Sequence, residues 1–329
     1  MVKKICVPGG AGYVGSRLVP ELLKRGYHVN VLDLYLYGDE VLEKHPHLTQ
    51  IKGDIRDPKV VEKALDQCKA ALHLACISND PSFELNPELG KSINLDSFEP
   101  FVQIAKKKGV ERFIFASSSS VYGVKEVPNV TEDMELEPLT DYSKYKAECE
   151  KILLKYASDD FICTILRPAT VCGFASRQRL DVVVNILTNL AYRTGKVKVM
   201  GGAQMRPNIH IEDMVRAYIH VLEAPKEKIQ KKIYNVGYHN HTVLSLGQMV
   251  QQIVGKKRPV DLVVEPTNDN RSYHVSSKKI AEELGFHPKY TIENAIEDLL
   301  QAFESGKLPN SLEDHRYFNI KTMKAIQLQ

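Results

Sequence analysis

The stretch Val7-Pro-Gly-Gly-Ala-Gly-Tyr-Val-Gly-Ser16 decides the fold, because it joins an apolar run to a helical pattern through evenly spaced glycines. The run Lys4-Ile-Cys-Val7 precedes it, and apolar residues recur at helical spacing from Ser16 to Lys24. Gly9, Gly12 and Gly15 let the backbone approach a phosphate closely, and the amino end of the helix points N–H groups at the anion. The pattern predicts a strand, a tight turn and a helix around a pyrophosphate site.

An acidic residue follows the glycines at the distance that a dinucleotide site requires. The second apolar run, His28-Val-Asn-Val-Leu-Asp33, ends in Asp33, roughly 20 residues after the turn, where a carboxylate binds the ribose in such sites. The alternative is a glycine turn between packed elements with no ligand. The position of Asp33 favours the ligand-binding interpretation.

Composition excludes several classes of protein. The chain has 329 residues, a formal charge of +3, 43% hydrophobic and 26% charged residues, which are ordinary globular values. Lysines and arginines are scattered, so we expect no nucleic-acid partner. No run of 18 apolar residues occurs and the chain starts directly in a strand, so we expect neither a membrane span nor a signal peptide. Six cysteines without metal-ligand spacing predict reduced thiols, no metal site and a cytoplasmic setting.

Strands and helices alternate through the first half of the chain. Strands are expected at 4–7, 28–33, 47–51, 70–75, 112–116 and 161–166, with long helices at 87–108 and 142–156. Asp57 and Pro58 are expected to cap and begin a helix. This alternation predicts an α/β fold with a parallel, doubly wound sheet, which binds ligands at the carboxyl ends of its strands.

The second half is less regular. We expect helices at 180–192, 245–254, 276–284 and 292–303, and strands at 197–200 and 233–236, the last of them extending the sheet. Residues 1–170 are therefore predicted to form a nucleotide-binding domain. Residues 171–329 are predicted to form mainly a smaller α/β substrate lobe, with 197–236 returning to the sheet. The tail after Gly306 is polar and is expected to be partly mobile.

Two stretches carry candidate catalytic residues. Tyr142 and Lys146 are four apart on a predicted helix, so both side chains lie on one face. A tyrosine with a pKa near ~10 is a poor base at neutral pH, and a neighbouring ammonium stabilises the phenolate. The serines at 117–120 follow a strand at the carboxyl edge of the sheet. A solvated helix face and a flexible serine loop are the alternatives for the two stretches.

Together these motifs resemble those of the extended short-chain dehydrogenase/reductase family, the sugar-nucleotide epimerases and dehydratases, whose nucleotide-binding half is a Rossmann-type sheet. The resemblance covers nearly the whole chain. Its motifs follow in family order: the glycine turn, Gly53-Asp-Ile55, His73-Leu-Ala75, Asn94, Ser-Ser-x-x-Val-Tyr-Gly123, Tyr-x-x-x-Lys146 with Glu150, Arg167-Pro-x-x-x-x-Gly173 and Arg206-Pro-Asn-Ile-His-Ile-Glu-Asp213.

The resemblance implies a role for each matching residue. Tyr142 would take the proton from a sugar hydroxyl, Lys146 would lower its pKa and hold the nicotinamide ribose, and Ser118 would bond the same sugar oxygen. Asp33 would bond the adenosine ribose, which together with Leu34 favours NAD over NADP. The implied cofactor-binding residues are Gly9, Gly12, Tyr13, Val14, Gly15, Asp33, Asp54, Ile55, Leu74, Ala75, Cys76, Asn94, Ser117, Tyr142, Lys146 and Pro168.

The implied substrate is a nucleotide-diphosphate sugar, with Arg206 and Arg271 as candidates for gripping the diphosphate. Surface ion pairs are the alternative for both arginines. His73 and His210 are expected to be structural. The implied substrate residues are Ser78, Asn79, Ser118, Ser119, Thr170, Arg179, Arg206 and Arg271.

The implied reaction is oxidation at C4 of the sugar. Family 4,6-dehydratases carry acids directly after the catalytic Ser or Thr, where this chain has Ser119 and Ser120, so dehydration is disfavoured. An epimerase leads. A 4-dehydrogenase is the alternative, since Arg179-Leu-Asp181 and Asp269-Asn-Arg-Ser-Tyr-His-Val275 resemble enzymes acting on GDP-heptoses. A non-catalytic NAD sensor ranks lowest. The resemblance also implies a homodimer through a four-helix bundle of helices 87–108 and 142–156.

Overall fold

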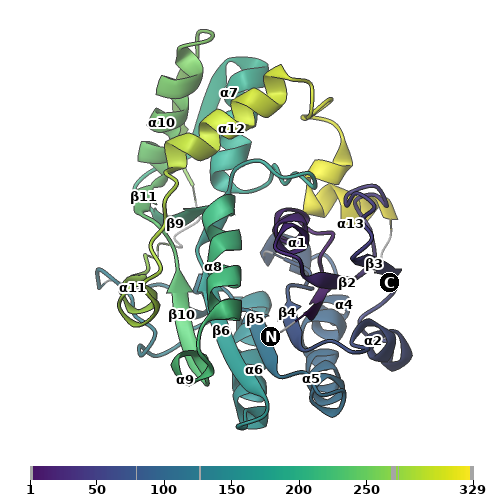
Figure 1. Cartoon of the computed structure of the whole chain (residues 1–329). Helices are drawn as coiled ribbons and strands as arrows, with labels where there is room; N and C mark the ends of the chain where they lie inside the picture. The colour runs from purple at the N-terminus through teal and green to yellow at the C-terminus, as the bar shows by residue number, and fades with distance from the viewer. Residues whose placement is uncertain (1–2, 79, 126, 268–271, 273, 327–329) are drawn as a thin grey trace.

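A seven-stranded parallel sheet forms the centre of the computed structural model, which describes residues 3–78, 80–125, 127–267, 272 and 274–326 (Figure 1). This confirms the predicted doubly wound fold. In spatial order its strands are β10 (Lys232–Val236), β6 (Ile162–Pro168), β5 (Arg112–Ala116), β4 (Ala70–His73), β1 (Lys4–Pro8), β2 (His28–Asp33) and β3 (Leu48–Lys52).

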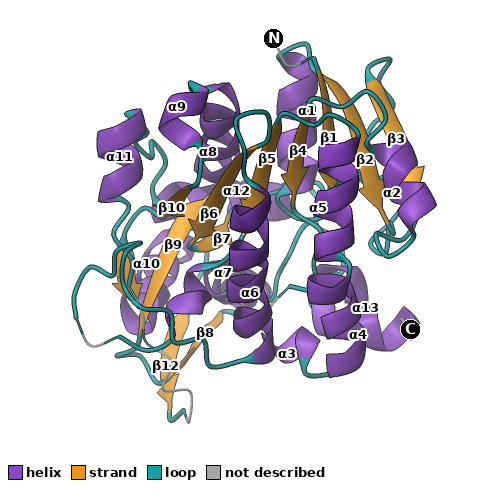
Figure 2. Ribbon diagram, turned by 90° about the horizontal axis from the view of Figure 1, so that it is seen from below, coloured by secondary structure: helices purple, strands orange, loops and turns teal. Residues whose placement is uncertain are grey.

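Helices cover both faces of this sheet (Figure 2). One face packs against α1 (Gly15–Lys24) and α8 (Ile211–Glu223), and the other against α2 (Pro58–Ala64), α5 (Phe98–Lys107) and α6 (Asp141–Tyr156). The strands are apolar along most of their length because both faces are buried. Asp57 caps α2 as predicted, with its carboxylate accepting a bond from Lys59 N at 2.9 Å.

The expected helix at 87–108 is interrupted. It consists of α4 (Pro87–Lys91), a π-helical turn η1 (Ser92–Asp96) and α5. Side-chain hydroxyls accompany the turn, since Ser92 donates to Leu89 O and Ser97 to Ile93 O. Such bonds compete with the regular helical ladder, and π-helical turns often occur at functional sites. The short helix α3 (Asp80–Phe83) precedes α4.

The second half adds a lobe with its own core. Its strands form a three-stranded sheet of β11 (Asn240–Thr242), β9 (Met205–His210) and β7 (Thr170–Cys172), and a pair of β12 (Asp261–Glu265) and β8 (Lys196–Met200). Its helices α7 (Val183–Thr194), α10 (Val243–Gly255) and α12 (Ile292–Glu304) share one apolar cluster. Within 197–236, β10 joins the main sheet and α8 packs on its face, whereas the expectation is wrong for β8 and β9, which pair outside that sheet.

The remaining elements are short. They are η2 (Ser119–Tyr122), α9 (Lys226–Ile229), α11 (Lys278–Leu284), η3 (His315–Tyr317) and α13 (Asn319–Ile326). The last two correct the expectation of a mobile tail, because Asn319 and Thr322 are buried and Met323 packs against Ile77 and Ile93. Figure 1 shows the yellow α13 returning to the first half of the chain.

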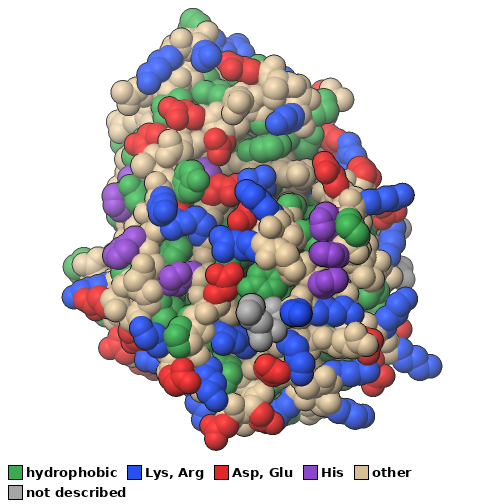
Figure 3. All heavy atoms as spheres, in the orientation of Figure 1, with side chains coloured by type: hydrophobic (Ala, Val, Ile, Leu, Met, Phe, Trp, Pro, Cys, Tyr) green, Lys and Arg blue, Asp and Glu red, His purple; other side chains and the backbone are tan. Residues whose placement is uncertain are grey.

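The surface charge and the cysteines characterise the molecule as a whole. Basic and acidic side chains are intermixed over the visible face (Figure 3), in keeping with a formal charge of +3. Among the described residues, no helix combines the length and apolarity that crossing a bilayer needs. All six cysteines are free thiols, and five of them are buried.

Candidate active site

A cavity of about 370 Å³ opens at the carboxyl ends of the central strands, where doubly wound sheets bind ligands. Its size falls within the range of small-molecule sites. Most of the predicted site residues lie around it, which brings together parts of the chain from Gly9 to Arg179. The predicted residues in its wall are Gly9, Gly12, Tyr13, Val14, Gly15, Asp33, Asp54, Ile55, Leu74, Ala75, Cys76, Ser78, Ser117, Ser118, Ser119, Tyr142, Lys146, Pro168, Thr170 and Arg179.

The glycine turn forms one wall and has no room for side chains. Gly9 has φ +78°, and a Cβ atom there would lie 2.5 Å from the amide nitrogen of Ala75. A Cβ on Gly15 would overlap the carbonyl of Gly10. Helix α1 begins at this turn and carries no acidic residue in its first turn, so its positive end faces the cavity uncompensated. The turn therefore fits the pyrophosphate of a dinucleotide.

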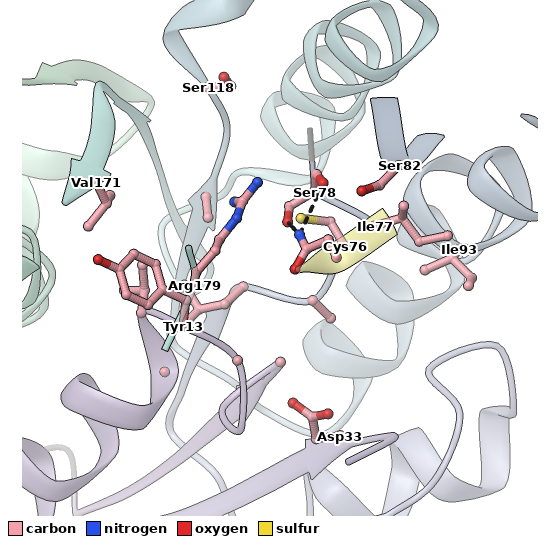
Figure 4. A pocket seen from close by; sticks show the side chains of 18 of the residues that line it. Tyr13, Asp33, Cys76, Ile77, Ser78, Ser82, Ile93, Ser118, Val171 and Arg179 are labelled. Carbon is pink, nitrogen blue, oxygen red and sulfur yellow. Dashed lines mark hydrogen bonds between the residues drawn. The ribbon is translucent and has the colours of Figure 1, made fainter. Parts of the chain in front are cut away.

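Asp33 lies at one end of the cavity, on the opposite side from Ser118 (Figure 4). Its carboxylate accepts bonds from the amides of Ala11 and Tyr35, both at 2.9 Å. Burial raises its pKa, and these two amides oppose that change. An acid fixed in this way at the end of β2 fits the ribose hydroxyls of an adenosine.

Asp54 belongs to the same end of the cavity. Arg56 binds its carboxylate through Nε at 3.0 Å and Nη2 at 2.6 Å. Burial opposes the change, but these bonds hold the pKa of Asp54 below its usual value. Asp33 and Asp54 are the only acids in the described wall of the cavity.

The other end carries Ser118, Tyr142 and Lys146. Helix α6 begins with a capping box in which Thr140 and Ser143 bond each other's backbone, and this fixes its first turn. One turn later, Lys146 donates to the carbonyl of Ala116 at 2.7 Å, and its Nζ lies 6.0 Å from the centre of the Tyr142 ring. The ammonium is therefore held between β5 and the phenol ring.

The serine cluster is also fixed. The Ser118 hydroxyl lies 2.8 Å from that of Ser120, and Ser119 is buried at the start of η2. Ser117 donates to Glu150, whose carboxylate is clamped by Arg167 through Nε at 2.9 Å and Nη2 at 2.6 Å. The hydroxyl of Ser117, a predicted cofactor residue, is thus bonded to the buried ion pair of Glu150 and Arg167.

Two predicted residues, Asn94 and Arg206, are absent from the described cavity wall. Asn94, in the π-helical turn, donates to Ile77 O at 2.9 Å and accepts from Ile77 N at 2.8 Å, so it holds the loop after β4 and is absent from the described cavity wall. Arg206, the second residue of β9, donates to its neighbour Met205 O at 2.9 Å and is also absent from the described wall. Asn79 and Arg271 lie outside the described residues.

The histidines are structural, as expected. His73 is packed among Phe98, Phe101, Phe113 and Phe115, and burial, with help from Lys146, lowers its pKa to about 3. His210 caps α8 by accepting from Glu212 N and contacts Asp298 at 3.2 Å. Neither histidine takes part in the wall of the described cavity.

Sequence reasoning missed part of the wall. Tyr37, Arg177, Asn319 and Met323 all line the cavity. Arg177 stands two residues before Arg179, in a stretch already singled out, so its proximity was an available clue. For Asn319 and Met323 the sequence offers no such clue, because the tail carries no recognisable motif. Arg179 itself lies in the wall, bonded to Asp181 at 2.6 Å.

Comparison with known proteins agrees with this geometry. The model of the NAD dependent epimerase/dehydratase family matches residues 5–237. A UDP-glucose 4-epimerase from Lactobacillus helveticus is 28% identical over 331 residues, covering 94% of this chain and 99% of the relative.

Two solved structures show the likeness in three dimensions. A UDP-glucose 4-epimerase from Thermotoga maritima, solved with UDP-glucose, has a TM-score of 0.82 at 26% identity, covering 92% of this chain and 99% of that one. A dTDP-glucose 4,6-dehydratase from Streptomyces venezuelae shares the fold, with a TM-score of 0.83 at 24% identity, covering 94% and 100% of the two chains.

Proposed function

This chain belongs to the NAD-dependent epimerase/dehydratase family, and on that basis we propose that it is a sugar-nucleotide epimerase acting at C4 of the sugar. The cofactor of the family is NAD. The relatives named UDP-glucose 4-epimerase support the reaction and make UDP-hexoses the first substrates to test.

The cavity fits the cofactor along its whole length. The turn at Gly9–Gly15 would hold the pyrophosphate, and Asp33 the adenosine ribose. From β2 to β5 the sheet advances by three strand spacings, roughly 14 Å, which suits the separation of adenosine ribose and nicotinamide. When bound, NAD would supply the hydride acceptor for the sugar carbon and return that hydride to the opposite face of the sugar.

The chain's own groups would handle the proton. Tyr142 Oη would take the proton of the C4 hydroxyl, and the buried Lys146 ammonium would stabilise the resulting phenolate. Ser118 would donate to the same sugar oxygen and orient it. Proton return from Tyr142 would complete the reduction. Thr170 and Arg179, in the wall beside them, would contact the sugar diphosphate.

One observation carries the choice of epimerase over dehydratase. The acids of the described cavity wall, Asp33 and Asp54, both belong to the adenosine end, and Ser119 and Ser120 follow Ser118. Eliminating water across C5 and C6 needs groups that exchange protons there, and a serine hydroxyl is a poor acid or base. Oxidation and reduction at C4 need only Tyr142, Lys146 and Ser118.

A 4-dehydrogenase that releases the keto sugar is the second candidate. It is favoured by Arg179, which lies in the cavity wall and is fixed by Asp181. These two residues belong to the stretch that resembles GDP-heptose dehydrogenases. A non-catalytic NAD sensor ranks below both, because such a protein has no need for Tyr142 and Lys146.

The test is absorbance at 340 nm of the purified holoprotein, first with UDP-glucose and UDP-galactose and then with GDP-, CDP- and dTDP-sugars. We expect a small or transient signal and a product inverted at C4. A lasting stoichiometric signal with a keto product would assign the dehydrogenase instead.

Replacing the base separates enzyme from sensor. We expect Tyr142→Phe to lower kcat by about 10²–10⁴-fold while NAD stays bound. Tyr145→Phe, on the same helix but packed on Phe83, is the matched control and should keep its activity. Full activity of Tyr142→Phe would contradict the mechanism.

We also propose a homodimer in the cytoplasm. Helices α5 and α6 lie side by side and carry the partly buried Ile104 and Ile152, together with exposed charges of both signs. Six unpaired thiols support a reducing compartment.

A further inference from the structure

The C-terminal segment 315–326 contributes to the wall of the cavity and is held there by one buried amide. Asn319, at the start of α13, is 3% exposed. Its Oδ1 accepts from Arg177 Nη2 at 2.5 Å and from Tyr37 Oη at 3.1 Å, and its Nδ2 donates to Ser78 Oγ at 2.9 Å. Its backbone N–H donates to Asp181 at 2.9 Å.

These bonds tie together three loops that are far apart in sequence. Tyr37 follows β2, Ser78 follows β4, and Arg177 and Asp181 follow β7. All three loops contribute to the cavity wall, as do Asn319 and Met323 themselves. One turn after Asn319, Met323 packs against Ile77, Leu89 and Ile93. The tail therefore spans the cavity on the side facing the loops after β2 and β4.

Arg177 bonds Asn319 through Nη2, but no described carboxylate forms an ion pair with its guanidinium. It is 4% exposed, its guanidinium stacks 3.5 Å from the centre of the Tyr37 ring, and its Nε has no hydrogen-bond partner among the described residues. No carboxylate of the described residues forms an ion pair with it, whereas Arg179 has Asp181 and Arg167 has Glu150. A buried, unpaired charge is costly unless a ligand of opposite sign compensates it.

The position of Arg177 identifies that ligand. Its backbone N–H donates to Ser16 Oγ at 3.2 Å, so the residue lies beside the first turn of α1, where the glycine turn fits a pyrophosphate. From there its side chain crosses to Tyr37, in the loop after Asp33. The pyrophosphate that the glycine turn fits would lie between these two points, within the cavity that Arg177 lines.

We propose that Arg177 supplies the counter-charge for the NAD pyrophosphate and that the C-terminal segment 315–326, through Asn319 and Met323, is a clamp that must open before the cofactor leaves. Asn319 is a positioning residue, because it fixes the guanidinium and the loops and needs no contact with the cofactor. The proposal concerns cofactor retention and does not depend on the sugar chemistry.

The first experiment measures cofactor release without any sugar. Purified holoprotein is mixed with excess alcohol dehydrogenase and ethanol, which convert each released NAD to NADH, and the absorbance at 340 nm is followed. We expect Asn319→Ala and Met323→Ala to release NAD at least about tenfold faster than the wild type. Lys324→Ala, on the exposed side of the same helix, is the matched control and should release at the wild-type rate.

The outcomes are distinct. Wild-type release rates in both Asn319→Ala and Met323→Ala would overturn the clamp. Because Met323→Ala leaves the hydrogen bonds of Asn319 in place, it also separates closure from misfolding of the tail, and near-ultraviolet circular dichroism checks that each variant is folded.

The second experiment tests the counter-charge by calorimetry on protein stripped of cofactor. We expect Arg177→Gln to lower the affinity for ADP-ribose by roughly 10–100-fold, which corresponds to the loss of charge-assisted hydrogen bonds. The affinity for adenosine should stay nearly unchanged. Arg316→Gln, an exposed arginine of the same tail, is the control. Equal ADP-ribose affinity in Arg177→Gln and wild type would overturn the assignment. A larger loss for NADP than for NAD would also overturn it and move Arg177 to the 2′ side of the ribose.

Discussion

Asp33 is the single residue that we propose binds the adenosine ribose of the cofactor. Two backbone amides orient its carboxylate toward the cavity, and burial raises its pKa above its ordinary value near 3.8. The ionised form is the one that accepts bonds from ribose hydroxyls and repels a 2′-phosphate. Burial therefore makes the charge of Asp33 sensitive to acid, while the bonds from the amides of Ala11 and Tyr35 favour the ionised form.

This predicts a pH dependence of NAD binding. Affinity is full where Asp33 is ionised, at neutral pH, and falls as the pH drops through a pKa above 3.8, because protonation removes an acceptor. Asp33→Asn should bind NAD roughly 10–100-fold more weakly at pH 7 and show a flat profile. Titrations between pH 8 and 5 on stripped protein measure both. Parallel slopes for the two proteins would assign the dependence to another group.

The positions of residues at the ends of predicted strands could be predicted from the sequence. Gly9, Asp33 and Ser118 follow strands of one parallel sheet, so topology alone brings them to a common edge. Asn319 could not be placed, because its bond to Tyr37 joins positions 282 residues apart and no local pattern marks it. Arg206 resembles a diphosphate ligand by motif, and this assignment stays a prediction.

Between elements, the ion pair of Glu150 and Arg167 joins helix α6 to strand β6. Both side chains are 3% exposed, and Ser117 and Tyr122 complete the network by bonding Glu150 and Arg167. The pair thus supports the catalytic helix from beneath, one turn after Lys146.

Breaking this pair should be costly. We expect Glu150→Ala to lower the free energy of unfolding by about 3–5 kcal/mol, because it leaves the Arg167 charge buried and unpaired. The double variant Glu150→Leu/Arg167→Met should lose less than the sum of the single variants. Chemical denaturation measures the cycle, with the exposed Lys151→Ala as control. A loss below about 1 kcal/mol in Glu150→Ala would contradict burial as the cause.

Most elements of the central sheet could be predicted, and those of the lobe less well. Long buried strands and amphipathic helices have strong periodicity, whereas β7 and β11 have three residues each. Strand β9 contains Pro207, which argues against a strand interior, yet it pairs on both sides. The π-helical turn at Ser92–Asp96 keeps helical composition, so periodicity alone gave one continuous helix.

At the scale of the whole molecule, the lobe and the tail turn an open sheet edge into a closed site. Tyr13 donates to Gly173 O at 2.7 Å and accepts from Asn185 Nδ2 at 3.0 Å, which fastens the glycine turn to the lobe. Asn319 fastens the tail to the loops after β2 and β4. Helices α5 and α6 lie on the other side of the sheet from α1 and α8, and they form the surface on which we propose the homodimer.

The proposed homodimer is tested on that surface. Light scattering at micromolar concentration should give twice the mass of one chain. Ile152→Glu places a charge among the partly buried side chains of α6 and should shift the protein to monomers. Because a two-fold interface contains the same residue from both copies, this one substitution introduces two charges into it. Val264→Glu, on the half-exposed β12, adds the same charge elsewhere and should stay dimeric. A monomeric wild type would refute the dimer, and a dimeric Ile152→Glu would move the interface away from α6.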